Sequence, residues 1–324
     1  MRGLYVPGAP VLGNIESGNG SGGADLSDID LTSQSLDSRI KYQCASSHAY
    51  YAADGTIQFA EPDVWPLEYR DGVVVGRHEP ERQTTNLLTH ATNFGEWRAA
   101  NSSVTNSDEM LFANEHAQFV TATATATYTR VYQTPTLADG DCVFTLYVKP
   151  GTTNYLHATL EDSTRQNSSH FYADLVTLTG GIVTAVGNLP VTVSVKKLDT
   201  GWFIVTATAT MPLTSPYYVY FGAANAPKTV AATAGDSIIV GFTQIEQGAV
   251  QTSPIVTQGA AGTRAAAFAS VRIYPGLTGL RISYSDGNTD IVRLDGQADD
   301  WYQLPASTSS WGERYIQRIS YFKE

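Results

Sequence analysis

The sequence predicts an all-β protein: a jelly-roll-like β sandwich with small N-terminal and C-terminal β modules and an extended N-terminal arm. Two runs alternate with a period of two, Val120–Gln133 (VTATATATYTRVYQ) and Trp202–Met211 (WFIVTATATM). Successive side chains on a strand point to opposite faces, so this period is typical of strands. The chain also contains 28 glycines and 14 prolines, and short alternating segments recur at the spacing of a sandwich.

The first segment, residues 1–35, is the predicted arm. It has a short apolar start, then a Gly/Ser/Asn-rich run, then an acidic stretch. Such a composition is flexible by itself. Two interpretations stay open: an attachment arm that becomes ordered against another protein, or a disordered tail. We favour the attachment arm.

The second segment, residues 36–85, is predicted to be a small N-terminal β module. Residues 39–45 and 56–60 alternate, with a turn at 53–55 between them. The sequence Arg70-Asp71-Gly72 predicts a hairpin turn between two further strands.

The third segment, residues 86–269, is the predicted sandwich. We expect the run at 118–133 to be one continuous strand, with threonines on one face and alanines and Tyr128 on the other. Small side chains of this kind permit close approach to a second sheet or to a neighbouring subunit. A short helix is expected at 259–270 (GAAGTRAAAFAS). The other expected strands are 141–149, 155–161, 169–174, 192–198, 202–211, 217–223 and 237–244.

The last segment, residues 270–324, is predicted to be a C-terminal β module. Residues 280–284, 289–294 and 314–322 are predicted strands, and Asp286-Gly287-Asn288 is a turn between the first two.

The composition restricts the class of partner. Charged residues make up only 16% of the chain, and the formal net charge is −11. Phosphate binding needs a basic surface, so nucleic acid is not expected as a partner, and neither is a polyanionic polysaccharide. A neutral sugar or a protein fits better. No apolar run reaches membrane-spanning length, and the N-terminus has no signal-peptide core, so we expect folding in a reducing cytoplasm.

The two cysteines, Cys44 and Cys142, lie far apart in the sequence. They form neither a disulfide framework nor a zinc-binding pattern. Each lies in a strand-like run, so we expect buried free thiols.

One hydrolase-like motif is present but incomplete. Gly235–Ile239 (GDSII) resembles the GDSL motif, in which Ser237 would be the nucleophile. Such a serine needs a histidine base, which in that family follows near the C-terminus. Here the last histidine, His170, precedes the serine. We expect a turn that leads into a strand, and we predict no catalytic residue.

Carboxylate pairs and histidines offer no clear site either. Adjacent carboxylates on a strand point to opposite faces, so we interpret the pairs as solvated turns rather than glycosidase pairs. The six histidines lack metal-ligand spacing. We predict no cofactor, and a structural calcium held by backbone oxygens would leave no motif. The pairs considered are Glu161 with Asp162, Asp108 with Glu109, and Asp299 with Asp300.

The tyrosines are the remaining candidates for ligand binding. Tyrosine combines an apolar face with a polar group, which suits both sugar rings and subunit interfaces. If Val219 and Phe221 point inward, Tyr218 and Tyr220 form an exposed platform. Sugar binding, trimer contact and an ordinary surface or core role all stay open. The candidate ligand-binding residues are Tyr155, Tyr172, Tyr218 and Tyr220, while Trp97 and Trp202 are expected in the core.

Two stretches resemble phage tail-fibre and head-spike fibre proteins that contain a carbohydrate-binding-module-like sandwich. The first is residues 38–88, with Arg39, Ala45-Ser46, Asp54-Gly55 and the end EPERQTTNLL in register. The second includes LYVKPGTTNYL, DTGWFIVTATAT and GFTQIEQGAVQTSPIVTQGAAGTRAA. The chain departs from the family's pattern at Gln43-Cys44 and at Arg77-His78.

The resemblance implies a structural protein of the phage particle, assembled in the host cytoplasm, and not an enzyme. It implies a homotrimer that contacts other virion proteins, here through the N-terminal arm. The sandwich would attach to a host-surface glycan, and several copies would raise the avidity of weak sites. The alternative is a purely structural head fibre, decoration protein or tail adaptor with no external ligand.

Overall fold

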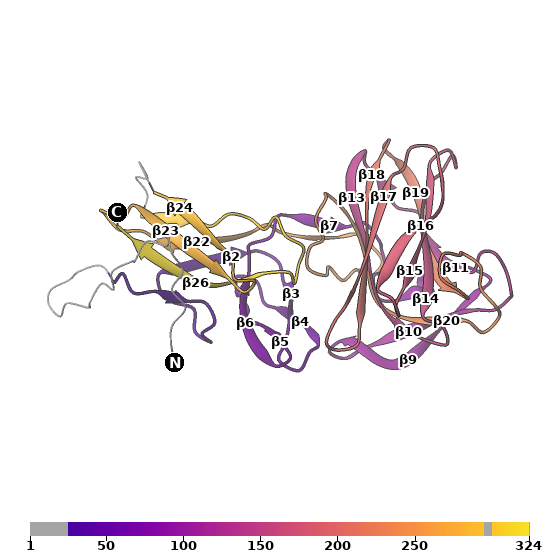
Figure 1. Ribbon diagram of the computed structural model, residues 1–324, viewed down its shortest axis with the longest axis horizontal. Helices are drawn as coiled ribbons and strands as arrows, with labels where there is room; N and C mark the ends of the chain where they lie inside the picture. The colour runs from indigo at the N-terminus through magenta and orange to yellow at the C-terminus, as the bar shows by residue number, and fades with distance from the viewer. Residues whose placement is uncertain (1–24, 295–299, 324) are drawn as a thin grey trace.

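The computed structural model describes residues 25–294 and 300–323. The molecule is elongated and has two bodies side by side (Figure 1). We call the body built mainly from residues 86–258 the sandwich, and the body built from residues 25–83 and 267–323 the base. The described residues form strands and one short 3-10 helix, η1 (Phe94–Glu96), so the all-β prediction is confirmed. None of their helices has the length and apolar character needed to cross a membrane.

The sandwich consists of two sheets. The eight-stranded sheet runs, in spatial order, β17 (Val191–Lys197), β18 (Phe203–Met211), β13 (Gly140–Pro150), β20 (Ser237–Gln247), β10 (Glu115–Ala122), β9 (Ser102–Phe112), β4 (Ile57–Ala60) and β3 (His48–Tyr51). The seven-stranded sheet runs β16 (Thr179–Val186), β15 (Ser168–Asp174), β14 (Tyr155–Asp162), β19 (Ser215–Ala224), β11 (Arg130–Gln133) and β8 (Arg98–Ala100), with β12 (Thr136–Leu137) beside β19. The strands of both sheets pair antiparallel except for β4, which pairs parallel with β9.

Alternate residues of both sheets fill the core between them. Phe144 and Val205 point inward from the eight-stranded sheet, and Leu160, Phe171 and Phe221 from the seven-stranded sheet. All of these side chains are almost fully buried. Because every second residue of a strand points into this core, several of these strands could be predicted from their periodicity.

The two Thr/Ala runs have different structures. The run after Trp202 forms one continuous strand, β18, as predicted. The prediction of one strand over 118–133 is wrong: β10 ends at Ala122 and β11 begins at Arg130. β10 pairs with β20 in one sheet, whereas β11 pairs with β19 in the other, so residues 123–129 cross between the sheets. The crossing depends on the choice of strand partners, which the alternation does not encode.

The base is built from both ends of the chain. One sheet has the order β24 (Thr289–Arg293), β23 (Gly279–Tyr284), β26 (Tyr315–Phe322), β6 (Val73–His78) and β5 (Glu68–Arg70), with β1 (Ile29–Asp30) beside β26. A second sheet contains β2 (Ile40–Cys44), β22 (Ala267–Arg272) and β25 (Trp301–Gln303). The segments 36–85 and 270–324, separate modules in the sequence-based division, thus share sheets and one hydrophobic core.

The predicted helix at 259–270 is wrong. These residues form β21 (Gly262–Arg264), which pairs with β7 (Thr84–Asn86), and the start of β22. β22 pairs along its length with β2, and this pairing outweighs the helix preference of the alanines.

The predicted arm is only partly described, since residues 1–24 lie outside the described residues. Residues 25–35 belong to the base. β1 pairs with β26, and the side chains of Ile29 and Leu31 are fully buried in the base core. Any segment available for attachment therefore ends before β1.

The base contributes β3 and β4 to the end of the eight-stranded sheet and also packs on the outer face of that sheet. Tyr51 and Trp311 of the base stack with ring centroids 4.2 Å apart. They join a buried cluster with Tyr147, Trp202 and Phe242 of the sandwich. The two bodies are therefore connected by a packed interface, and not only by the two strands, β7 and β21, that link them.

Candidate functional site

The four tyrosines predicted to bind a ligand lie on one face of the seven-stranded sheet. Leu156, Ala158 and Leu160 of β14 point into the core, so the alternate residues of that strand point outward. The register carries this orientation across the sheet. It places Tyr155, His157, Thr159 and Glu161 of β14 on the same side as His170 and Tyr172 of β15 and Tyr218 and Tyr220 of β19. We call this side the outward face.

The expected exposed platform of Tyr218 and Tyr220 is only half present. Val219 and Phe221 point inward, as that prediction required. Tyr218 is half-buried, but Tyr220 is only 3% exposed. The guanidinium of Arg130 covers the Tyr220 ring, with its Cζ 4.5 Å from the ring centroid.

Arg130 organises a cluster that sequence reasoning missed. Its Cζ lies 5.3 Å from the Tyr128 ring centroid and 6.0 Å from that of Tyr132, within the range of cation–π attraction. The Tyr132 and Tyr218 rings are 6.1 Å apart. We call Tyr128, Arg130, Tyr132, Tyr218 and Tyr220 the Tyr/Arg cluster. The alternation of Tyr, Arg and Tyr at 128, 130 and 132 was the available signal.

A layer of buried polar groups supports this cluster. His170 Nδ1 lies 2.8 Å from Thr159 Oγ1 and 3.2 Å from the Tyr220 hydroxyl. His157 Nε2 lies 2.9 Å from the carbonyl oxygen of Thr129, so it is the nitrogen that donates. His157 Nδ1 has no hydrogen-bond partner among the described residues. The two histidines contact Tyr220 and Tyr128 of the cluster, and His157 ties the layer to Thr129 of the crossing segment 123–129.

The charge of the outward face follows from burial. Burial lowers the pKa of His157 to about 4, and burial together with Arg130 lowers the pKa of His170. Both imidazoles are therefore neutral at pH 7, and Arg130 is the cation of the site. Half-exposed tyrosine rings around a guanidinium offer apolar stacking surfaces with hydrogen-bond donors at their edges, which suits a sugar ring.

Ser237 of the GDSII motif is the first residue of strand β20 and follows the turn before it. Its side chain is buried, and its Oγ accepts a hydrogen bond from the backbone N–H of Thr152 (3.1 Å). Its own N–H donates to Thr152 Oγ1 (2.8 Å). The hydrogen bonds of Ser237 in the described structure thus join two turns.

The carboxylate pairs have structural contacts. Glu161 forms an ion pair with Arg165 at 3.5 Å, whereas the buried Asp162 accepts hydrogen bonds from the turn that follows it, including Thr164 N–H at 2.9 Å. Glu109 forms an ion pair with Lys149 at 2.5 Å. Asp299 lies outside the described residues. No three His, Cys, Asp or Glu side chains among the described residues are grouped as metal ligands would be.

Both cysteines, Cys44 and Cys142, are free and buried, as predicted. Trp97 and Trp202 are core residues, also as predicted, with exposed fractions of 5% and 2%.

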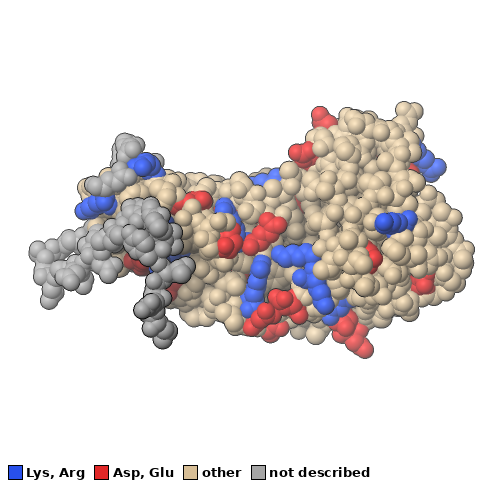
Figure 2. All heavy atoms as spheres, viewed as in Figure 1, with Lys and Arg blue, Asp and Glu red and all other residues tan. Residues whose placement is uncertain are grey.

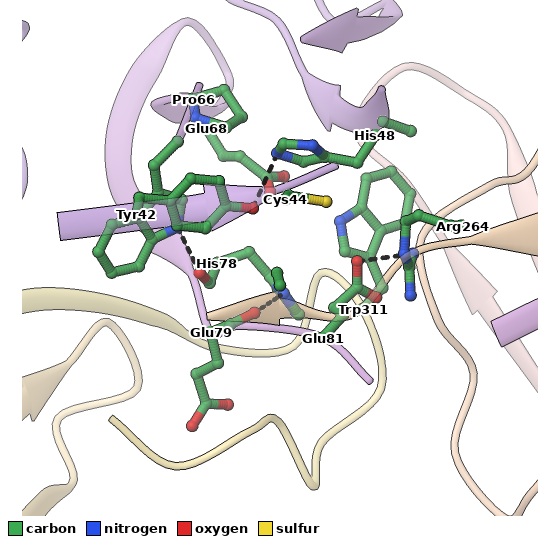
Figure 3. A pocket seen from close by; sticks show the side chains of 13 residues that line it. Tyr42, Cys44, His48, Pro66, Glu68, His78, Glu79, Glu81, Arg264 and Trp311 are labelled. Carbon is green, nitrogen blue, oxygen red and sulfur yellow. Dashed lines mark hydrogen bonds and ion pairs between the residues drawn. The ribbon is translucent and has the colours of Figure 1, made fainter. Parts of the chain in front are cut away.

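A second concentration of polar groups lies where the base meets the sandwich (Figure 3). Arg264 Nη1 forms an ion pair with Glu81 Oε2 at 2.8 Å, and Ser253 N–H donates to the other oxygen of Glu81 at 2.7 Å. His48 and His78 lie nearby, and both are buried. The cavity among them holds only about 10 Å³, so this group, which we call the junction cluster, is closed to a ligand.

Residues beside the junction cluster join distant parts of the backbone. Asn86 Nδ2 donates to the carbonyl oxygens of Thr243 (3.3 Å) and Ile255 (3.0 Å), and its Oδ1 accepts from Leu88 N–H (3.1 Å). Glu246 accepts from Thr252 N–H at 2.9 Å. Glu79, Arg82, Asn86, Glu246 and Arg264 all belong to the stretches that carry the fibre-protein resemblance. In this structure Asn86, Glu246 and Arg264 form hydrogen bonds or ion pairs that stabilise the junction.

Two open depressions lie beside the junction. One, of about 480 Å³, lies between the base and the β17–β18 turn and is lined by Arg70, Lys196, Asp71 and Asp199 among others. The other, of about 880 Å³, is lined by Phe59 and Phe112 among others. Figure 2 shows charged side chains gathered in the middle of this view of the molecule, while the sandwich at the right is mostly uncharged.

No protein-family model and no curated protein matches the chain. Among solved structures, the chain is similar to the CBM22-1 xylan-binding domain from Paenibacillus barcinonensis Xyn10C. The two share 15% sequence identity with a TM-score of 0.32, over 51% of this chain and 95% of that one.

Proposed function

We propose that the chain is a structural attachment protein, a fibre or spike component of a phage particle, and that its sandwich binds a neutral host-surface glycan. The resemblance of residues 38–88 and 241–266 to fibre proteins supports the virion role. The low charge of the chain supports a neutral ligand. The observation that carries the binding role is the Tyr/Arg cluster on the outward face.

The geometry of the cluster supports a sugar more than a small apolar ligand. Tyr128, Tyr132 and Tyr218 expose parts of their rings on an open sheet face, with Arg130 between them. A sugar ring stacks its apolar C–H face on such rings, and its hydroxyls accept hydrogen bonds from the guanidinium. His170 packs against Tyr128, and Arg130 lies over the rings of Tyr128, Tyr132 and the buried Tyr220, which limits the entropy lost on binding.

A purely structural role is the second candidate, and the junction favours it. Buried ion pairs and an aromatic cluster fix the base against the sandwich, which suits a spacer that transmits position and force. In this role the Tyr/Arg cluster would contact only protein.

A glycan array probed with the full chain separates the two roles. The attachment role predicts binding to at least one neutral oligosaccharide, and a loss of at least ten-fold in signal for the Tyr132→Ala/Tyr218→Ala double variant. Phe59→Ala removes another exposed aromatic ring, on the far side of the junction, and serves as the matched control. Binding that survives the double variant overturns the assignment of the site, and an array without any binding favours the structural role.

The virion role has its own test. Removal of residues 1–24 leaves β1 and the base core intact, and should abolish incorporation of the chain into particles. A truncated chain that is incorporated as well as the full chain contradicts attachment through this segment.

A further inference from the structure

The sheets of this protein protect their edges in different ways, with one exception. Sheet edges invite pairing with other chains, and proteins protect them with short strands, charges or prolines. β8, β5 and β25 have three residues each, and β3 has four. β24 carries Asp290 and Arg293, β2 carries Lys41, and β17 ends in two lysines.

β16 is the exception among the edge strands of the described residues. It has eight residues, ends the seven-stranded sheet, and contains no charge and no proline. Its one irregularity is a bulge at Val183, where the register against β15 shifts between His170 and Phe171, so that residues on the two sides of the bulge keep matching faces in the pairing proposed below. The uncharged stretch extends from Val176 to Val186 (VTLTGGIVTAV). Four of its aliphatic side chains are strongly exposed: Val176 63%, Leu178 43%, Ile182 41% and Val186 53%. This is the composition of a strand that is covered in its working state.

We propose that β16 pairs antiparallel with β16 of a second copy of this chain. A two-fold axis between Ile182 and Val183 places Thr179 opposite Val186 and Gly180 opposite Ala185. Thr179 and Val186 both point outward, since they pair with Asp174 and Ser168 of β15, and Gly180 and Ala185 both point inward. Residues that face each other across this pairing therefore share a face, as an antiparallel pair requires.

The absence of charge on β16 also favours pairing with a second copy of the same strand. The chain carries a net charge of −11, which disfavours association through most surfaces, but two copies of β16 bring no like charges together. The protein's own N-terminal segment is a poorer candidate, since the described chain begins in the base, whereas β16 lies in the sandwich (Figure 1).

The proposed interface is isologous, so it leaves no unpaired copy of the edge for a third chain. Each copy uses the same edge, so pairing consumes both β16 strands and gives a dimer rather than a filament. The axis is perpendicular to the sheet, so the two outward faces lie on the same side of one continuous sheet. This dimer differs from the trimer that the fibre-protein resemblance implies.

Sedimentation equilibrium of the full chain tests the proposal. We expect a dimer, and we expect Thr184→Lys/Val186→Lys to weaken dimerisation at least ten-fold, because the substitutions place charges along the pairing edge, which is how proteins keep a free edge unpaired. Thr192→Lys/Ser194→Lys adds the same charges to exposed positions of β17 and should leave the dimer intact. Circular dichroism checks that each variant is folded.

Hydrogen exchange supplies a readout of backbone pairing. In the dimer, the β16 amides that point away from β15 should exchange at least ten-fold more slowly than in the lysine variant. A monomer at all concentrations overturns the proposal, as does a trimer or dimer that persists in the β16 variant. Loss of the dimer on removal of residues 1–24, with the β16 variant still dimeric, assigns assembly to the N-terminal segment instead.

Discussion

The junction cluster and the outward face use the same kinds of residue for different purposes. Each combines histidine and arginine with tyrosine, which at the junction is Tyr42, whose hydroxyl lies 3.2 Å from His48 Nε2. At the junction the polar groups are enclosed, and the guanidinium of Arg264 lies against the carboxylate of Glu81. On the outward face, Arg130 lies over the rings of three tyrosines and forms no ion pair with another described residue, and three of the cluster's tyrosines remain partly open to solvent.

The difference shows that residue type does not separate a structural site from a binding site. What separates them is whether the protein itself satisfies the polar groups. Glu81 is satisfied by Arg264 and Ser253, so it contributes to stability. Arg130 has no carboxylate partner among the described residues and keeps hydrogen-bonding capacity for a ligand.

Glu68 at the junction should give the largest effect. It is 1% exposed, and burial raises its pKa to about 8 from an ordinary value of 4.5. Between these values the folded protein binds more protons than the unfolded chain, so its stability falls as the pH rises through this window. The loss approaches about 5 kcal/mol at high pH, and Glu68→Gln should abolish it. Urea unfolding at pH 5 and pH 9 measures the difference, and an unchanged pH dependence in the variant would contradict the account.

The second largest effect is expected for Glu81→Ala. It should lower the free energy of unfolding by about 3–5 kcal/mol, because it leaves the buried guanidinium of Arg264 without its carboxylate partner. Glu61→Ala, at an exposed position, should change the free energy of unfolding by less than about 0.5 kcal/mol. Denaturant unfolding at pH 7 measures both. Equal stability of the two variants would show that the ion pair is not needed at the junction.

His157, which is fully buried on the outward face, should have the opposite pH dependence. Its folded pKa of about 4 lies below the ordinary value of 6.5. The unfolded chain binds the additional proton in this window, so stability falls as the pH decreases from 6.5 to 4, by about 3 kcal/mol. His157→Gln should flatten this slope in unfolding curves at pH 7 and pH 4.5. A histidine NMR titration that gives a pKa above 6 for His157 would contradict the buried, neutral assignment.

Arg130→Lys should have the smallest effect on stability and a clear one on binding. Lysine keeps the charge but loses the planar group that lies over the tyrosine rings, so the free energy of unfolding should fall by only about 1 kcal/mol. Binding of the neutral oligosaccharide that gives the strongest array signal should weaken about ten-fold. Calorimetric titration measures it, and unchanged affinity would remove Arg130 from the site.

Much of the fold could be predicted because period-two burial is local information. The inward residues of β14 and β19 follow from alternation alone. That the four candidate tyrosines share one face follows from the register of β14 with β15 and β19, which alternation does not give. The crossing at 123–129 could not be predicted, since residues on both sides of it alternate equally well. The pairing of β2 with β22 joins residues more than 200 positions apart, which no local pattern reports.

The exposure of the candidate residues was beyond sequence reasoning for the same reason. Tyr220 has an outward position, but Arg130 from another strand covers it. β16 was not predicted because its two glycines weaken a strand pattern. The proposed dimer rests on the edge position of β16, and that position depends on the order of all strands in the sheet.

The crystal structure of the full chain with the neutral oligosaccharide that gives the strongest array signal is the most direct test of the central claim. The account predicts a sugar ring stacked on Tyr132 or Tyr218, with a hydroxyl hydrogen-bonded to Arg130. Electron density for the sugar in the depression beside Arg70 and Lys196, with an empty outward face, would contradict it.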